Sequence, residues 1–166
     1  MFQTMDPKAL TENVFSLIAD KWMLITAGTA ESCNTMTASW GGLGVIWGVP
    51  AATCYIRPQR YTKEFVDREE YFTLTFFGEE HRKALALCGS KSGREVDKVK
   101  ECGFTIRTAA CGAPYFEEAE LVLVCRKRFA QEMDPACIPA DVKEKHYPNQ
   151  DYHTIYIGEI VEVLKK

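Results

Sequence analysis

Apolar and polar residues alternate over several short segments, and this pattern predicts a chain built mainly from β-strands. Strands are predicted at six places, namely 22–26, 35–47, 52–56, 71–77, 121–129 and 153–164. The last of these carries Ile155, Ile157 and then Ile160 on an alternating pattern. Most segments are not the continuous apolar runs that are typical of a parallel sheet. The pattern therefore favours a mainly β chain, an antiparallel barrel with peripheral helices.

Helical spacing appears between the predicted strands. Residues 11–20 and 61–68 place apolar side chains on one face, and Thr11 and Thr62 stand where they could cap these two helices. A third helix is predicted over 79–88.

Several small residues set the expected limits of these elements. Gly89 is expected to end the third helix. Ser92 and Glu95 have the spacing of a capping box, which predicts one more short helix before Gly103. Four glycines between 41 and 48 predict bulges, sharp bending or the close approach of another group. Residues 135–150 are expected to form a loop with a short helix.

The length and the net charge of the chain limit the classes of function that it can have. The chain has 166 residues, which predicts one domain over 1–166. Its formal net charge is -3, from 20 basic and 23 acidic residues, and this balance does not indicate a nucleic-acid partner or an anionic membrane partner. No apolar stretch approaches the roughly 20 residues of a membrane helix, and the first residues do not resemble a signal peptide. We expect a cytoplasmic protein.

The seven cysteines do not form a recognisable framework. Their number is odd, their spacing is irregular, and neither a CxxC pair nor a zinc-like Cys/His set occurs. Reduced, mostly buried thiols and no metal site are therefore expected. Cys33 lies beside the most informative segment of the chain, so a reactive cysteine stays open as an alternative.

Three segments could carry chemistry. Residues 34–41 place hydroxyl and amide groups in an extended stretch, which suits a flat heteroaromatic ring and also suits an ordinary barrel strand. In 56–62, two arginines flank the start of a helix, where arginine can bind phosphate, although a solvated turn explains them equally well. Residues 89–98 gather serines and basic residues at another predicted helix start.

Taken together and in this order, these segments resemble the flavin reductase-like family of FMN-binding split barrels, which includes the flavoredoxins. The quoted residues are Asn34 to Trp40, Ile56 to Thr62, and Ser90 to Arg94 with Asp97 and Lys98. The closing stretch from Tyr152 to Ile160 also looks like that family's last barrel strand. The likeness extends over nearly the whole chain.

The resemblance implies a six-stranded Greek-key split barrel that forms a homodimer and binds FMN without a covalent bond. It implies cofactor contacts from Asn34, Met36, Thr37, Ala38, Ser39, Trp40, Arg57, Tyr61, Thr62, Ser90, Ser92, Gly93, Arg94 and Lys98. His153 stands where related reductases often carry a histidine near the nicotinamide, which makes it the catalytic candidate. Asp151-Tyr152 precedes it where many reductases have Gly-Asp, so a structural histidine at a strand end is an equal alternative.

Two functions follow from the resemblance, and others stay open. The first is NAD(P)H-dependent flavin reduction or electron transfer through bound FMN. The second is a flavoredoxin-type electron carrier that is reduced by a redox partner protein. A flavin-storage or interaction module, a barrel that has lost its cofactor, a Cys33-based redox enzyme and pyridoxamine-phosphate oxidation are the remaining alternatives.

Overall fold

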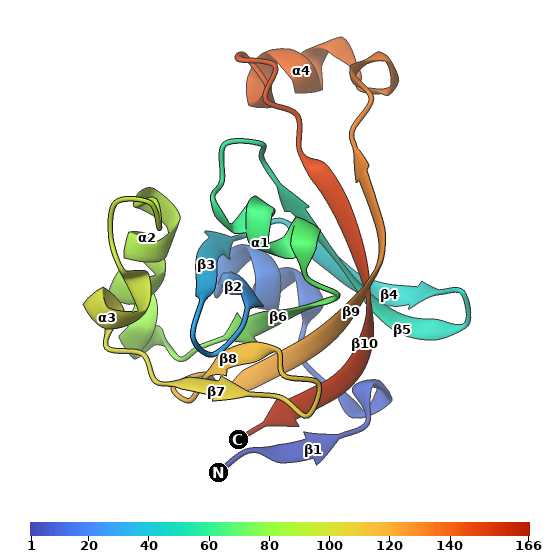
Figure 1. The fold of residues 1–166 in the computed structure, drawn as a ribbon. Coiled ribbons are helices and arrows are strands. Elements are labelled where there is room, and N and C mark those ends of the chain that lie inside the picture. The colour runs from blue at the N-terminus through green and yellow to red at the C-terminus, as the bar shows by residue number, and fades with distance from the viewer.

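The centre of the fold is one antiparallel sheet that curls into a barrel (Figure 1). The computed structural model describes all residues, Met1–Lys166. Seven strands follow the order β3-β2-β6-β9-β10-β5-β4, and β1 pairs with β10. Their bounds are β1 Gln3–Met5, β2 Met23–Gly28, β3 Cys33–Ala38, β4 Gly41–Ile46, β5 Val49–Ile56, β6 Tyr71–Phe76, β9 Leu121–Glu132 and β10 Thr154–Lys165. Because only Ser39 and Trp40 join the two edge strands β3 and β4, the sheet must curve until its edges approach each other.

The helices and a small second sheet lie around this barrel (Figure 1). The second sheet pairs β7 (Ile106–Thr108) with β8 (Pro114–Phe116). The α-helices are α1 Thr62–Arg68, α2 Arg82–Ser90, α3 Lys98–Cys102 and α4 Ala140–His146, and short 3-10 or π turns cover Pro7–Ala9, Ser16–Asp20, Glu79–His81 and Pro135–Cys137. The longest α-helix has nine residues, whereas a helix that crosses a bilayer takes about 20.

Both faces of the sheet are buried near its middle, so alternate residues enter two different cores. Ile25 of β2 belongs to the larger cluster inside the barrel, whereas its neighbour Leu24 belongs to a second cluster between the sheet, α2 and β8. Leu123 and Val122 of β9 divide in the same way. Burial on two faces explains why these central strands have apolar runs although the sheet is antiparallel.

The interior leaves no room at Gly158 of β10. A Cβ atom there would lie 2.7 Å from the Cβ of Cys125 and 2.7 Å from the Phe72 ring. The register of β10 against β9 shifts between Ile157 and Gly158 and again between Ile160 and Glu162. These irregularities bend β10, so that one part of the strand lies in the barrel wall and the other part extends beyond the barrel.

The expected mainly β, antiparallel barrel with peripheral helices is confirmed, and the number of strands differs. The segment 35–47 holds two strands, β3 and β4, because the chain breaks at Ser39 and Trp40. The strands β1, β7 and β8 have three residues each, which is too short for alternation to reveal. The predicted bulges in 41–48 were wrong, since β4 keeps an unbroken register with β5, but Gly41 does meet the Thr53 carbonyl closely, at 2.8 Å from an added Cβ.

Four predicted helix limits were wrong, and local hydrogen bonds give the reasons. Asn13, not Thr11, caps the first helical turn by accepting from the Phe15 and Ser16 amides. Thr62 lies inside α1 and accepts from Asn34 instead of capping.

The other two errors concern the chain after α2. Gly89 is a helical residue, because α2 continues to Ser90. Ser92 accepts from the Arg94 amide in a turn, and Asp97 is the N-cap of the following helix, where it accepts from the Lys100 amide. The predicted end of that helix at Gly103 is confirmed, with φ 67.

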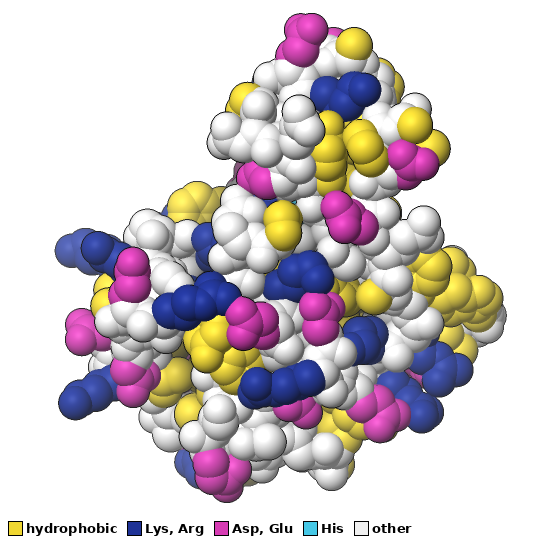
Figure 2. Space-filling view, turned by 45° about the horizontal axis from the view of Figure 1, so that its top comes forward, with side chains coloured by type: hydrophobic (Ala, Val, Ile, Leu, Met, Phe, Trp, Pro, Cys, Tyr) yellow, Lys and Arg dark blue, Asp and Glu magenta, His cyan; other side chains and the backbone are white.

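Two parts of the chain leave the barrel. The ends of β9 and β10, with α4 between them, rise above it as an extension at the top of Figure 1. The β4–β5 hairpin projects to the side and turns at Trp47 and Gly48, which both have positive φ, as a type I′ turn requires. At its tip Val45 is 76% exposed and Trp47 is 59% exposed, and apolar atoms gather in the corresponding region at the right edge of Figure 2.

Candidate functional site

Two clefts follow one another along β3. The first, which we name the α3 cleft, has a volume of about 500 Å³ and lies between the start of β3, α1 and the chain before and within α3. The second, which we name the aromatic cleft, has a volume of about 310 Å³ and is bounded by the end of β3, Trp40, Tyr55 and His153. Both clefts are large enough to admit a small organic ligand or a part of one.

The structure divides most of the predicted site residues between these clefts. The aromatic cleft is lined by Met36, Thr37, Ala38, Ser39, Trp40, Arg57 and His153. The α3 cleft is lined by Asn34, Tyr61, Gly93, Arg94 and Lys98. Thr62, Ser90 and Ser92 line neither cleft. Since no ligand is present, the predicted contacts with flavin stay predictions.

Two cations meet at the C-terminal end of α2. Arg60 donates to the carbonyl oxygen of Gly89 at 2.7 Å and to that of Cys88 at 3.2 Å. Lys98 donates to the same Cys88 carbonyl at 2.9 Å and to the Thr35 carbonyl at 2.8 Å. Arg60 lines the aromatic cleft and Lys98 lines the α3 cleft. The two clefts are therefore adjacent at the end of α2, where a cation from each cleft donates to the same Cys88 carbonyl oxygen.

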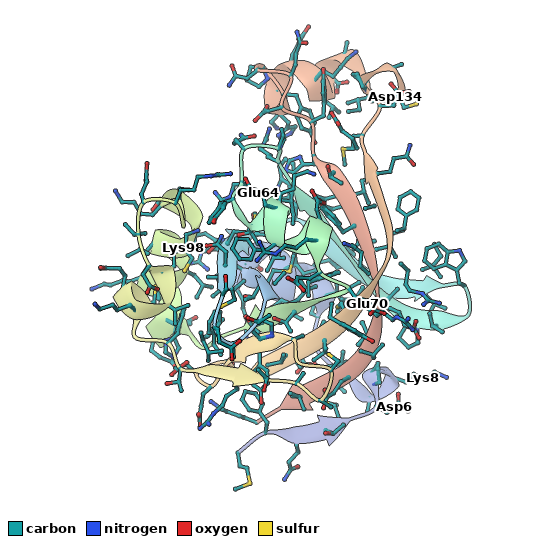
Figure 3. All side chains as sticks on the ribbon, viewed as in Figure 1. Asp6, Lys8, Glu64, Glu70, Lys98 and Asp134 are labelled. Carbon is teal, nitrogen blue, oxygen red and sulfur yellow. The ribbon has the colours of Figure 1, made fainter.

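Neither cation has an acidic partner. Arg60 and Lys98 form no ion pair with a carboxylate, although Lys98 is only 4% exposed. Figure 3 shows Lys98 between α3 and the barrel. Burial, and then the charge of Arg60, lower the pKa of Lys98 to about 8. A buried positive charge without a counter-ion is unfavourable, and an anion bound beside the pair would relieve this.

Close backbone packing shapes the α3 cleft. The Asn34 side chain donates to the Thr62 hydroxyl at 2.7 Å and so ties β3 to α1. Gly93 approaches the same side chain so closely that an added Cβ would lie 1.9 Å from the Asn34 amide oxygen. A larger residue at position 93 would therefore displace the Asn34 side chain, and the 89–98 segment lies directly against β3.

The remaining polar residues of this region are engaged locally. Arg94 pairs with Glu64 of α1 and lies over the Tyr61 ring, 4.3 Å from its centroid. The Ser90 hydroxyl donates to the Ala86 carbonyl within α2 at 2.9 Å. The Ser90 hydroxyl is therefore bonded to a carbonyl oxygen of its own helix. Arg94 is an exposed side chain at the rim of the α3 cleft.

Arg57 ties the β9–β10 extension to the barrel. Its guanidinium pairs with the Asp151 carboxylate at 2.9 Å and donates to the His146 carbonyl at 2.9 Å. It also lies over the Tyr147 ring at 5.0 Å from the centroid. These contacts hold the extension over the aromatic cleft, so Arg57 has less freedom than Arg60 to bind an external phosphate.

An aromatic wall with a buried histidine closes one side of the aromatic cleft. The Trp40 ring lies 5.1 Å from the His153 ring, and the Tyr55 ring lies 6.4 Å from it. His153 is 7% exposed and its Nδ1 is 2.7 Å from the Tyr147 hydroxyl. Burial, and next the charge of Arg57, lower the pKa of His153 to about 4. His153 is therefore a neutral imidazole at neutral pH.

The cysteine alternative lacks chemical support. Cys33 lines the α3 cleft, but burial, and then the charge of Asp97, raise the pKa of its thiol to about 11. The thiolate is the nucleophile in cysteine chemistry. A protonated thiol at neutral pH is a poor starting point for a Cys33-based redox reaction.

Several residues in and around these clefts are not among the predicted site residues. Arg60, from the quoted segment 56–62, and Tyr55 of β5 both line the aromatic cleft. Tyr147 and Asp151 line neither cleft, but they contact His153 and Arg57. Arg60 could have been selected from the sequence together with Arg57, because both arginines flank the start of the predicted helix. No local pattern indicates that residues 147–151 fold back on Arg57.

Fold and clefts together define a curved antiparallel barrel with a cation pair beside an aromatic cleft, which fits the class of split-barrel flavoproteins. The family model for the flavin reductase like domain matches residues 15–166. The chain therefore belongs to the flavin reductase-like family. No curated protein sequence shows significant similarity to it.

Solved structures with the same fold have different activities. An FMN-binding domain of flavin reductase-like enzyme from Shewanella baltica OS155 aligns with a TM-score of 0.71 and 17% identity, over 99% of this chain and 77% of that one. Flavoredoxin of Desulfovibrio vulgaris aligns with a TM-score of 0.69 and 20% identity, over 99% and 77%. An NADH:FAD oxidoreductase of Streptomyces globisporus, in complex with NAD and FAD fragments, aligns with a TM-score of 0.66 and 18% identity, over 88% and 74%.

The lowered pKa of Lys98 predicts how the stability of the ligand-free protein depends on pH. The folded pKa is about 8 and the ordinary value is 10.5, so between these values the unfolded chain binds more protons. The contribution of Lys98 to the free energy of unfolding should therefore rise with pH from about 8 to 10.5. Urea unfolding of the wild type and of Lys98→Met across this window should show the steeper rise in the wild type, and equal slopes would contradict the burial of a charged Lys98.

Proposed function

We propose that the protein binds FMN non-covalently and works as an oxidoreductase of the flavin reductase type. The observation that carries the proposal is the pair of Arg60 and Lys98, two cations without an acidic partner at the junction of the two clefts. Phosphate is the anion that suits such a pair, because charged hydrogen bonds from arginine and lysine are its usual protein contacts. Membership of the flavin reductase-like family points to a flavin mononucleotide as its carrier.

The residues present fit this cofactor. Arg60 and Lys98 would hold the phosphate, and the aromatic cleft, with polar groups from Thr37 and Ser39, would take the ring. When bound, FMN supplies the hydride and electron transfer that protein side chains do not. Trp40 and His153 shield one side of the cleft from water, and the neutral His153 adds no charge there. The Arg57 guanidinium also lines the aromatic cleft, and its positive charge favours a bound group that becomes more negative on reduction.

The role of the cation pair can be tested by comparing two flavins. Arg60→Met and Lys98→Met should each weaken FMN binding about 10- to 150-fold, which corresponds to the loss of a charged hydrogen bond worth about 1.5–3 kcal/mol. Binding of riboflavin, which lacks the phosphate, should stay within about twofold of the wild type. Fluorescence titration of both flavins measures the effect.

The control for this test is Arg107→Met, which removes an exposed arginine that pairs with Glu117 and lines neither cleft. It should leave both affinities unchanged. An equal loss of FMN and riboflavin affinity in Arg60→Met or Lys98→Met would show that these residues support the fold and not the phosphate. A wild-type protein that stays colourless with excess FMN would overturn the proposal itself.

The electron donor that we propose is a reduced nicotinamide. The NADH:FAD oxidoreductase of Streptomyces globisporus shares the fold and is described in complex with NAD, and the aromatic cleft offers planar rings for stacking. The second candidate is an electron carrier that receives electrons from a redox partner protein. It is favoured by the similarity to the flavoredoxins of Methanosarcina acetivorans and Desulfovibrio vulgaris.

Stopped-flow mixing separates these two candidates. FMN-loaded protein should lose its flavin absorbance within seconds after anaerobic mixing with NADH or NADPH. Dithionite serves as the control, because it should bleach the flavin in either case. Bleaching by dithionite together with the failure of both nicotinamides would select the carrier function.

We also propose that the protein forms a homodimer through the β4–β5 hairpin. The exposed apolar tip at Val45 and Trp47 would be shielded by a second copy, and exposed apolar patches commonly mark such contacts. Trp47 keeps a positive φ of 52 in the turn, a conformation that a non-glycine residue adopts at a cost. A large apolar side chain held there is more easily explained by an interface than by the turn itself.

The substitution Trp47→Asn tests this interface without damaging the turn, because asparagine is favoured in a type I′ turn. The variant should keep the wild-type secondary structure and shift from dimer to monomer at micromolar concentration in light scattering after gel filtration. Phe15→Ser, which removes another exposed aromatic side chain, should leave the dimer intact. A monomeric wild type, or a Trp47→Asn dimer as tight as the wild type, would contradict the proposed interface.

A further inference from the structure

Tyr147 and His153 form a buried pair at the base of the β9–β10 extension. Tyr147 follows α4 and is 5% exposed, and His153 precedes β10 and is 7% exposed. The Tyr147 hydroxyl oxygen and Nδ1 of His153 are 2.7 Å apart. The only other partner of the hydroxyl is the Met133 sulfur, at 3.4 Å.

Two proton arrangements satisfy these contacts. In the first, the phenol donates to Nδ1, and the imidazole proton is on Nε2. In the second, Nδ1–H donates to the phenol oxygen, and the phenol donates to the sulfur of Met133. A thioether is a weak acceptor, whereas an imidazole nitrogen is a strong one. The first arrangement is therefore the more stable.

Burial is the main reason why both groups of the pair are neutral. Burial raises the pKa of Tyr147, so the phenol retains a proton to donate, although Arg57 acts in the opposite direction. His153 is a neutral imidazole because burial and Arg57 outweigh the opposing effect of Asp151. His146, at the end of α4, makes an edge-to-face contact with Trp40, with the ring centroids 5.3 Å apart, and does not bond to either group.

The second nitrogen of His153 is free to serve a ligand. Nε2 makes no hydrogen bond to the protein, and the only fully buried side-chain polar atom without a hydrogen bond is the Asp151 oxygen that pairs with Arg57. Nε2 is therefore not sealed in the protein interior, and His153 lines the aromatic cleft. With Nδ1 held by Tyr147, the nitrogen that remains for the cleft is Nε2.

We propose that Tyr147 is a positioning residue, which donates to Nδ1 of His153 and thereby fixes Nε2–H as a hydrogen-bond donor toward the aromatic cleft. A fixed donor selects a ligand atom that accepts a hydrogen bond, such as the oxygen of a carbonyl or carboxamide. The assignment of the proton is independent of flavin. The assignment of the ligand class rests on the proposed function, since it concerns the same cleft.

Long-range ¹H–¹⁵N correlation spectra of the protein at neutral pH test the proton assignment, because protonated and unprotonated ring nitrogens have separate chemical shifts. His153→Gln identifies the His153 signals among the three histidines. We expect an unprotonated Nδ1 and a protonated Nε2 in the wild type. Tyr147→Phe should move both shifts toward the averaged values of a histidine that exchanges between its tautomers. A protonated Nδ1 in the wild type would overturn the proposal, and so would a Tyr147→Phe spectrum identical to that of the wild type.

Met133→Leu is the matched control, because it removes the competing sulfur and keeps the size of the side chain. The His153 shifts should stay as in the wild type. A change as large as that in Tyr147→Phe would show that the second proton arrangement is the real one.

Benzamide and toluene test the ligand class, because both are neutral and share a ring, and only benzamide carries an acceptor oxygen. Benzamide at millimolar concentration, added to the FMN-loaded protein, should shift the Nε2 signal of His153, and toluene should not. No shift with benzamide would overturn the assignment of the ligand class. Failure to bind FMN is seen separately as a colourless protein and leaves the tautomer result valid.

Discussion

One carbonyl group, that of Cys88 at the end of α2, organises the candidate site. Arg60 comes from the turn before α1 and Lys98 from the start of α3, and both donate to this oxygen. The C-terminal end of a helix carries partial negative charge, which favours nearby cations. That partial charge cannot neutralise two full charges, one of them nearly buried. The end of α2 therefore holds more positive charge than the protein itself neutralises, which is the physical basis of the proposed phosphate site.

The aromatic cleft depends on how far β9 and β10 extend beyond the barrel. Both strands have 12 residues, so their ends and the chain between them stand above the sheet (Figure 1). Arg57 anchors this extension by contacts with Asp151, His146 and Tyr147. The same anchor holds the segment that carries His153, which contacts Trp40 on one side of the aromatic cleft. Arg57 therefore shapes the cleft, whereas Arg60 and Lys98 are the cations that we propose for phosphate binding.

The division between strand-borne and loop-borne residues explains which site residues were predictable. Residues 36–40 lie together on the aromatic cleft because they are consecutive on β3 and in the short link to β4. Their extended pattern and polar groups are visible in the chain itself. Ser90 and Ser92 looked equally suitable, but α2 continues through Gly89, and Ser90 bonds within that helix. A glycine can end a helix or lie within it. Gly89 lies within α2 and packs against Thr37, where an added Cβ would lie 3.3 Å away. This contact is not visible in the sequence.

The sequence by itself determined the class of fold, because period-two alternation and short segments leave few alternatives to an antiparallel barrel. It also determined the stretch from Asn34 to Trp40 as a candidate binding strand. Only the tertiary structure decided that Arg60 and Lys98 share one carbonyl, that Arg57 is occupied by Asp151, and that Tyr147 meets His153. Arg60 and Arg57 reach partners 28 and 94 positions away, and Lys98 reaches the Cys88 carbonyl across the turn between α2 and α3. The contact between Tyr147 and His153 depends on an extension without regular periodicity. Such contacts arise from the closure of the sheet and from burial, which no local pattern records.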